Sequence, residues 1–541
     1  MNSVDKAQFT VLDYSFFVIV FLVSAAIGLY YAIKSRKIQT TIDDYLLGGR
    51  NMGLFPVICS LSATSVTGSS IVGLTAESYA YGSHIWMYSV VIFAMAMIVP
   101  FIFLPIFKEL KLTSSFKYFE LRFNRRVRLL ASLIFLSTGL LFLTVTVYVP
   151  ALTFQRVTGL NTYVTITILS LLCASYTAIG GFRAVLWTDV VQLMIMIVSC
   201  TVVGVIGIQA AGGLENVFKA GNRGGRIVIA NTNMNSRSSL AGYFLSQTLL
   251  GIYQYGFNQT NLQRFLSLPS GEKMKISAWT LAFVFGLFMC ASSFLGVIIY
   301  ANYETCDPFT SGIIQRVDQI LPHFIQERAN VFLGFSGIFI AGVFSASLST
   351  TSSYLNAMSG VIYEDFLSYR FSSIKQISAN RTMKIIVLIL GIFQILLVFF
   401  IEKMGMISQM TNQCMALNTA ALLTLFVLGA VFPKANNTGA QVGALTAILS
   451  ILILIIGSIN SKPEPTLPFQ THDCISNLTI NSFPDILNEE EDTRTFLGIS
   501  VGYLTSLFTG GNTVDDQRLL APFLRAKGDT EEAVNLQIQE R

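Results

Sequence analysis

The chain has 541 residues, of which 53% are hydrophobic and only 12% are charged, and its mean hydropathy is +0.61. This composition excludes a water-soluble globule and predicts an all-α, polytopic membrane protein. The formal charge of +5 forms no nucleic-acid-binding stripe, so no nucleic-acid partner is expected. Apolar runs of about 20 residues, enough to cross a bilayer, predict about 13 helices, at residues 13–33, 53–78, 84–107, 127–154, 161–180, 186–211, 240–263, 276–302, 330–362, 383–401, 404–432, 438–459 and 495–510.

Most Lys and Arg residues fall in alternate loops, which indicates the orientation of the chain. Cytoplasmic loops of membrane proteins carry an excess of Lys and Arg. Residues 34–52, 108–128, 264–275 and 515–541 are such basic segments. The N-terminus is therefore expected outside and the C-terminus in the cytoplasm. The first apolar run lacks a basic n-region and a cleavage site, which favours a retained helix over a signal peptide.

The segment 62–73, SATSVTGSSIVG, lies inside a predicted span yet is rich in hydroxyls and glycines. Hydroxyls and glycines at mid-membrane depth predict a helix that breaks and offers backbone carbonyls inward, a place to hold an ion. Close packing of helices through small residues is the alternative. A second Ser/Thr-rich stretch, SASLSTTSS at 345–353, favours the break, because two interrupted spans are typical of a transporter binding site.

The cysteines and sequons predict features of the outer loops. No cysteines form a CxxC pair, so metal ligation is not expected. Cys306 and Cys474 fall in predicted exoplasmic loops and could form a disulfide or stay reduced. Asn477 begins a glycosylation sequon in the same outer loop as Cys474.

Asp189 lies in GGFRAVLWTDVVQ (180–192), near apolar depth. An ionisable residue in a span is a functional candidate by default. A helix N-cap or first-turn carboxylate at the headgroup level is the other interpretation. The sequence leaves both open.

Four motifs in register resemble the sodium/solute symporter family: SATSVTGSSIVGL, GGFRAVLWTDVVQ, NQTNLQRFLS (258–267) and ASLSTTSSYLNA (346–357). They are most similar to the branch of the sodium/iodide, sodium-coupled monocarboxylate and sodium-dependent multivitamin transporters. The resemblance implies a five-plus-five inverted-repeat core. It divides the chain into 1–52 (first helix and inner loop), 53–212 (first repeat, helices 2–6), 213–239 (extracellular loop), 240–432 (second repeat, helices 7–11), 433–514 (helices 12–13 with the sequon loop) and 515–541 (cytoplasmic tail).

Na⁺ is a hard cation, which needs no carboxylate if enough carbonyl and hydroxyl oxygens converge. Ala346, Ser349 and Thr350 are spaced i, i+3 and i+4, so they share one helix face. The resemblance implies that their carbonyl and two hydroxyls bind sodium together with the carbonyls of Ala63 and Val66. It also implies that Asp189 assists sodium coupling.

The substrate is expected beside the break in the second helix. No membrane-embedded Arg or Lys is expected in this pocket, so hydroxyls, helix N-termini and bound sodium would hold an anion. Ser70 stands where the iodide transporter has glutamine, which favours a small organic anion over iodide. The candidate substrate-binding residues are Ser65, Ser69, Ser70, Tyr88, Tyr253, Tyr255 and Asn412.

The sequence therefore predicts a symporter in the plasma membrane that imports a small anionic substrate with Na⁺ by alternating access. A transporter of iodide or a neutral solute, or a sodium-gated sensor or channel on the same scaffold, are the alternatives. An enzyme is not expected, because no nucleophile motif or embedded His/Cys cluster is present. Membrane lipids are the expected surroundings, and the sequence does not indicate an oligomeric state.

Overall fold

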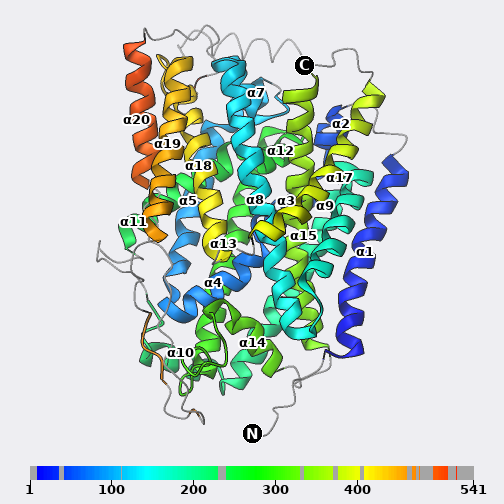
Figure 1. Cartoon of the computed structure of the whole chain (residues 1–541), viewed down its shortest axis with the longest axis vertical. Helices are drawn as coiled ribbons and strands as arrows, with labels where there is room; N and C mark the ends of the chain where they lie inside the picture. Colours follow the sequence, from blue (N-terminus) through cyan, green and yellow to red (C-terminus); the bar gives the residue numbers. More distant parts are fainter. Residues whose placement is uncertain are drawn as a thin grey trace.

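A computed structural model describes residues 9–35, 42–110, 112–228, 239–328, 334–368, 376–401, 407–459, 466–470, 474, 492–509 and 520. These residues form helices joined by turns, with no strand among them (Figure 1). The helices are α1 (Val11–Ser35), α2 (Ile42–Leu47), α3 (Leu54–Ser65), α4 (Gly68–Tyr81), α5 (Trp86–Ile102), α6 (Leu104–Glu109), α7 (Ser115–Arg122), α8 (Arg125–Thr158), α9 (Thr162–Ala210), α10 (Leu214–Arg223), α11 (Leu240–Gly256), α12 (Gln259–Leu266), α13 (Gly271–Asn302), α14 (Ile320–Glu327), α15 (Phe335–Val361), α17 (Gln376–Ile401), α18 (Ile407–Val431), α19 (Asn437–Ile459) and α20 (Asp492–Phe508), with the short helical turns η1 (Gly48–Arg50), η2 (Ser83–Ile85), η3 (Val317–Gln319) and η4 (Ile362–Leu367).

The all-α membrane architecture is confirmed. By length and composition, nine helices of the described residues can cross a membrane, or ten if α3 and α4 count as one span. Ten spans are three fewer than the predicted 13. Two predicted spans, 161–180 and 186–211, form the single helix α9, although Gly181 has a non-helical φ of 61° and divides this helix in two. Two others correspond to α11, which has only 17 residues, and to the short apolar helix within α20.

The predicted break in the second span is present. Helix α3 ends at Ser65 and α4 begins at Gly68, and the two axes are bent by 54°. Val66 has extended backbone angles, and the side chain of Thr67 accepts a hydrogen bond from the backbone N–H of Ser70, which caps α4. The C-terminal end of one helix and the capped N-terminus of the next therefore meet inside the apolar core.

The predicted interruption at 345–353 is wrong, because α15 is continuous through these residues. Its hydroxyls are accommodated within the helix: Thr350 donates to Ala346 O and Thr351 donates to Ser347 O. Ser and Thr at such positions bond to carbonyls of the preceding turn and need no break.

The second interruption lies instead between α11 and α12. Phe257 and Asn258 leave helical geometry there, and Asn258 Oδ1 accepts hydrogen bonds from the N–H and hydroxyl of Thr260. Thus the first span of each predicted repeat, rather than α15, carries a break.

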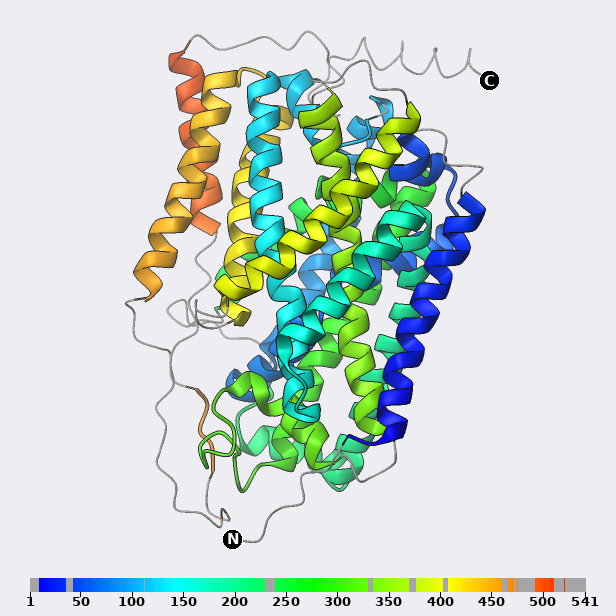
Figure 2. The same ribbon diagram turned by 45° about the vertical axis from the view of Figure 1, so that its right-hand side comes forward.

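The helices stand roughly along one direction, and the connecting elements gather at two ends (Figures 1 and 2). Helices α2, α7 and α12 lie at one end and α10 and α14 at the other. Cys306 and Cys474 form a disulfide, with their Cα atoms 5.2 Å apart. Because disulfides persist in oxidising compartments, the disulfide supports an exoplasmic location for the loops that hold Cys306 and Cys474. Asn477 lies outside the described residues, so its glycosylation stays a prediction.

Residues 466–470 pack over the end of α4. Arg226, whose side chain is fully buried, donates to the carbonyl of Tyr79 in α4 and, at 2.6 Å, to the carbonyl of Pro468 in this segment. Its guanidinium also lies 3.9 Å from the centre of the Tyr300 ring. Helix α4 of the broken span is therefore tied to residues 466–470, between α19 and α20.

Gly68 allows α4 to approach α15 closely, and its replacement tests this contact. A Cβ at Gly68 would lie 2.6 Å from Ser347 Oγ and 2.7 Å from the carbonyl oxygen of Val343. We expect Gly68→Ala to lower the free energy of unfolding by about 1–3 kcal/mol, because the backbone must shift to admit the methyl group. Thermal unfolding of the detergent-purified protein measures this loss.

Gly73→Ala in the same helix is the matched control, because a Cβ there meets no atom within 4 Å. It should leave the unfolding midpoint unchanged or raise it, since Ala favours helix more than Gly does. Equal midpoints for the two variants would contradict the close approach of α4 and α15.

Candidate functional site

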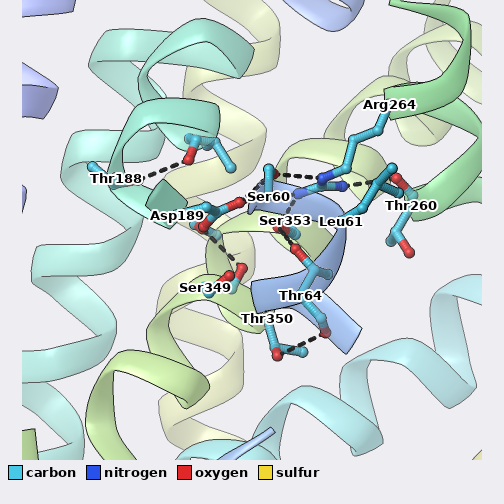
Figure 3. A network of polar contacts seen from close by, with 12 residues as sticks. Ser60, Leu61, Thr64, Thr188, Asp189, Thr260, Arg264, Ser349, Thr350 and Ser353 are labelled. Carbon is cyan, nitrogen blue, oxygen red and sulfur yellow. Dashed lines mark hydrogen bonds and ion pairs between the residues drawn. The ribbon is translucent and has the colours of Figure 1, made fainter. Parts of the chain in front are cut away.

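The face of α15 predicted to bind a cation points at the break in the second span (Figure 3). The side chains of Ala346, Ser349 and Thr350 are fully buried. Thr350 Oγ1 donates to Ala346 O at 3.1 Å and, across the interface, to Thr64 O in α3 at 3.2 Å. The hydroxyl face of α15 is therefore in direct contact with the last turn of α3.

Ala63 and Val66 lie at the C-terminal end of α3, where Val66 is the C-cap. The last carbonyls of a helix lack intrahelical donors, and the helix dipole makes this end negative. Both residues are buried, so water cannot replace the missing donors from open solvent. The oxygens predicted as sodium ligands thus come from two elements that the fold places side by side.

Two buried oxygens beside this contact, Ser349 Oγ and Asp189 Oδ1, make no hydrogen bond of good geometry among the described residues, although their side chains are close enough to interact with each other. A buried oxygen without a partner costs free energy, which a bound cation would offset. The oxygens present are hydroxyl, carbonyl and carboxylate groups, the kinds that a hard cation prefers. The residues therefore fit a site for sodium.

Asp189 lies in the middle of α9 with none of its side chain exposed, and it joins a polar cluster. Its Oδ2 accepts from Ser60 in α3 and pairs with the Nη2 of Arg264 at 3.4 Å. The alternative of an N-cap at the headgroup level is therefore wrong. Asp189 instead connects α9 to both broken spans, through Ser60 in α3 and Arg264 in α12.

Arg264 is a candidate functional residue that the sequence pattern did not reveal. It falls in the segment expected as a basic inner loop, 264–275, but the structure places it in α12 with 1% of its side chain exposed. Its guanidinium donates to Ser60 Oγ at 2.7 Å, to Thr260 O at 2.7 Å and to Ser353 in α15. The expectation that no Arg or Lys is embedded in the protein near the pocket is therefore wrong, because Arg264 is buried beside Asp189. The hydrogen-bond partners of Arg264 are not among the substrate candidates.

Ser353 extends this cluster to the cation site. Besides accepting from Arg264, its hydroxyl is 2.9 Å from Thr64 Oγ1 in α3. Thr64 in turn accepts through its carbonyl from Thr350. A continuous chain of polar contacts therefore runs from Arg264 to the predicted sodium ligands (Figure 3).

The Asn-Gln pair of the NQTNLQRFLS motif makes hydrogen bonds that orient α12. Asn258 caps the helix, and Gln259 Oε1 accepts from the N–H of Ser115, at the start of α7, at 2.8 Å, and from its hydroxyl. Arg264 belongs to the same motif, but its position just beyond an apolar run does not by itself indicate that it is buried.

The serine candidates for substrate binding cluster at the N-terminus of α4. Thr67 Oγ1 lies 2.9 Å from Ser69 Oγ and 2.6 Å from Ser70 Oγ, while Ser65 donates to Leu61 O. Ser65 and Ser70 are partly exposed, in contrast to their buried neighbours.

The remaining candidates are more dispersed. Tyr253 accepts a hydrogen bond from Asn418 of α18 at 2.8 Å, whereas Asn412, one of the predicted residues, is exposed. Tyr255 is buried, and Tyr88 is partly buried against the ring of Phe285. The substrate set stays a prediction.

Comparison with known protein families gives one match that covers most of the chain. The sequence profile described as "Sodium:solute symporter family" matches residues 45–447. Sodium-coupled monocarboxylate transporter 2 of Mus musculus is 31% identical over 508 residues, covering 92% of this chain and 82% of the relative. A candidate sodium-dependent multivitamin transporter of Drosophila melanogaster is 31% identical over 462 residues, covering 84% and 76%.

Solved structures show the same fold. A sodium-coupled sialic acid symporter in a substrate-bound outward-open state matches with a TM-score of 0.79 at 22% identity, covering 94% of this chain and 100% of that one. A nucleobase-cation-symport-1 family transporter in a closed conformation matches with a TM-score of 0.52 at 11% identity, covering 87% and 94%.

A double-mutant cycle tests the buried pair of Asp189 and Arg264. Removing one member of a buried ion pair leaves an uncompensated charge, which costs about 3–5 kcal/mol. We expect Asp189→Asn and Arg264→Gln each to lower the thermal stability strongly. The double variant should lose less than the sum of the two, because neither charge remains.

The matched control is Arg223→Gln, which removes a pair with Glu304 at the protein surface, where 62% of the arginine side chain is exposed. An exposed pair contributes about 1 kcal/mol or less, so this variant should unfold near the wild-type midpoint. Strict additivity in the double variant of Asp189 and Arg264 would show that the two side chains are not energetically coupled.

Proposed function

Because the chain belongs to the sodium:solute symporter family, we propose that it uses the sodium gradient to import a small organic anion, a monocarboxylate or vitamin-like carboxylate, across the plasma membrane. The observation that best supports coupling to sodium is the contact between α15 and the broken span, where the Thr350 hydroxyl donates to Thr64 O. The relatives named above are monocarboxylate and multivitamin transporters, which supports the class of substrate.

Sodium is one cargo of this cycle, and its proposed ligands come from two elements. Ala63 and Val66 supply carbonyls from α3, and Ala346, Ser349 and Thr350 supply a carbonyl and two hydroxyls from α15. A cation between them would hold α3 against α15, because its ligands belong to both helices. Its departure would remove the partner that the ligands of both helices share and so weaken this contact.

The N-terminus of α4 is the proposed place for the substrate carboxylate. This helix has 14 residues, and its N-terminal N–H groups and dipole favour an anion. Ser65 and Ser70 add partly exposed hydroxyls on the two sides of the break. The break would then present its negative helix end to sodium and its positive helix end to the anion.

The energetics of coupling favour more than one sodium per anion. A roughly tenfold sodium gradient supplies about 1.4 kcal/mol per ion, and a potential of about 60 mV supplies about 1.4 kcal/mol per net charge. One sodium with a monoanion is electroneutral and supports only about tenfold accumulation. Two sodium ions would supply about 4.2 kcal/mol, or roughly 1,000-fold accumulation.

Two-electrode recording from cells that express the chain tests this function. Lactate, nicotinate, biotin, iodide and glucose are applied in turn, first in sodium and then in choline. We expect an inward current with an organic anion in sodium alone, together with concentrative uptake of the radiolabelled anion. Uptake that persists in choline, or a response to glucose or iodide instead, would contradict the proposal.

Substitution of the α15 hydroxyls tests the sodium ligands. Ser349→Ala and Thr350→Ala each delete one ligand oxygen, and we expect each to raise the sodium concentration for half-maximal uptake about tenfold. Thr351→Ala is the matched control, because Thr351 Oγ1 donates within its own helix to Ser347 O. An unchanged sodium dependence in both ligand variants would show that sodium binds elsewhere.

A further inference from the structure

A cavity of about 490 Å³ lies at the end of the molecule where the last turn of α1 meets α2, η1 and the middle of α9. None of its lining residues belongs to the cation site, to the Asp189–Arg264 cluster or to the substrate candidates. Two cationic side chains, one carboxylate, one amide and two aromatic rings face it, from Lys34, Arg183, Asp44, Asn51, Tyr31 and Trp187.

The aromatic residues of this cavity mark the boundary between lipid and water. The rings of Tyr31 and Trp187 are stacked, with centroids 6.2 Å apart and planes inclined by 12°. Beside them Tyr30 and Ile33 are more than half exposed on the outside of the helix bundle. Tyr and Trp gather at the headgroup level of membranes, so this cavity opens beside lipid headgroups.

The guanidinium of Arg183 has unused hydrogen-bonding capacity. Its Nη2 donates to the carbonyl of Gly48 at 2.9 Å, and its Nε, which is buried from solvent, has no hydrogen-bond partner among the described residues. A Cβ at Gly49, where φ is +77°, would lie 3.0 Å from Asp44 Oδ1 and 3.6 Å from Arg183 Nη2. The glycine therefore leaves room between the carboxylate of Asp44 and the guanidinium of Arg183.

Lys34 also lines this space, from the last turn of α1; its side chain is exposed, and its ammonium donates to the Tyr30 hydroxyl at 3.3 Å. Long cationic side chains near helix ends reach the headgroup layer while their stems cover apolar surface. Lys34 and Arg183 thus bring positive charge from two different helices to one cavity at the membrane boundary.

We propose that this cavity binds the phosphate of an anionic phospholipid with a single phosphodiester group, such as phosphatidylglycerol. Arg and Lys are the usual phosphate ligands, and basic pockets between transmembrane helices bind anionic headgroups. Among the described residues that line the cavity, Lys34, Arg183 and Asp44 give a net charge of +1. This balance matches the single negative charge of one phosphodiester.

The acyl chains of such a lipid would lie along the exposed surface of Trp187 and Ile33, while its phosphate joins Lys34 of α1 to Arg183 of α9. The lipid would thereby connect α1, which lies outside the predicted core, to the core helix that carries Asp189. The proposal does not depend on which solute the chain transports.

Quenching of Trp187 fluorescence by brominated lipids tests the proposal directly. The chain has three tryptophans, so the background variant Trp86→Phe, Trp279→Phe leaves Trp187 as the only tryptophan reporter. The full-length protein is reconstituted in phosphatidylcholine vesicles that contain a minor fraction of brominated phosphatidylglycerol or brominated phosphatidylcholine. We expect a roughly fivefold preference for the phosphatidylglycerol quencher, since one cation near a surface contributes about this factor.

Lys34→Gln and Arg183→Gln should abolish this preference, and Lys273→Gln, an exposed cation in the first turn of α13, should retain it. Lys34 is exposed, so its variant tests the proposal even if Arg183→Gln fails to fold. Equal quenching by the two lipids, or a preference unchanged by Lys34→Gln, would overturn the proposal. A preference that persists in millimolar inorganic phosphate would support the lipid headgroup as the occupant, whereas its complete loss would show that a soluble anion displaces the lipid from the cavity.

Discussion

Inside a bilayer every backbone carbonyl needs a donor from the protein itself, and the break between α3 and α4 leaves the last carbonyls of α3 without one from their own helix. The hydroxyl face of α15 packs against these carbonyls and supplies a donor from another helix. Thr350 donates to Thr64 O, while Ser349 Oγ makes no hydrogen bond of good geometry among the described residues and lies within reach of the Asp189 carboxylate. The proposed sodium ion would complete the coordination of these oxygens.

The pair of Asp189 and Arg264 supports this arrangement from the side of α9 and α12. Both side chains are almost completely buried, so each would be costly alone. Ser60 contacts both of them, and Ser353 joins Arg264 to Thr64. The two broken spans and helices α9 and α15 therefore meet in one polar cluster. A change in charge within this cluster would affect all four.

Much of this fold could be predicted from composition and from the Ser- and Gly-rich stretch at 62–73, because hydroxyls and glycines at membrane depth favour a broken helix. The continuity of α15 could not be predicted from hydroxyl density alone, since Ser and Thr can bond within their own helix as well as mark a break. Arg264 could not be placed from the sequence, because a cation just beyond an apolar run looks the same whether it enters a loop or turns back into the protein. The serine candidates gather at the N-terminus of α4. On α18, by contrast, the predicted residue Asn412 is exposed, whereas Asn418 contacts Tyr253. The choice between two polar residues of one helix therefore requires knowledge of how the helix packs.

The contacts of residues 466–470 make the two halves of the broken span unequal. Arg226 joins the end of α4 to this segment, and the Cys306–Cys474 disulfide cross-links the chain close to it in sequence. The contacts of α3 described above, such as those of Ser60 and Thr64, are non-covalent. A rearrangement at the break would therefore meet less resistance on the side of α3 than on the side of α4.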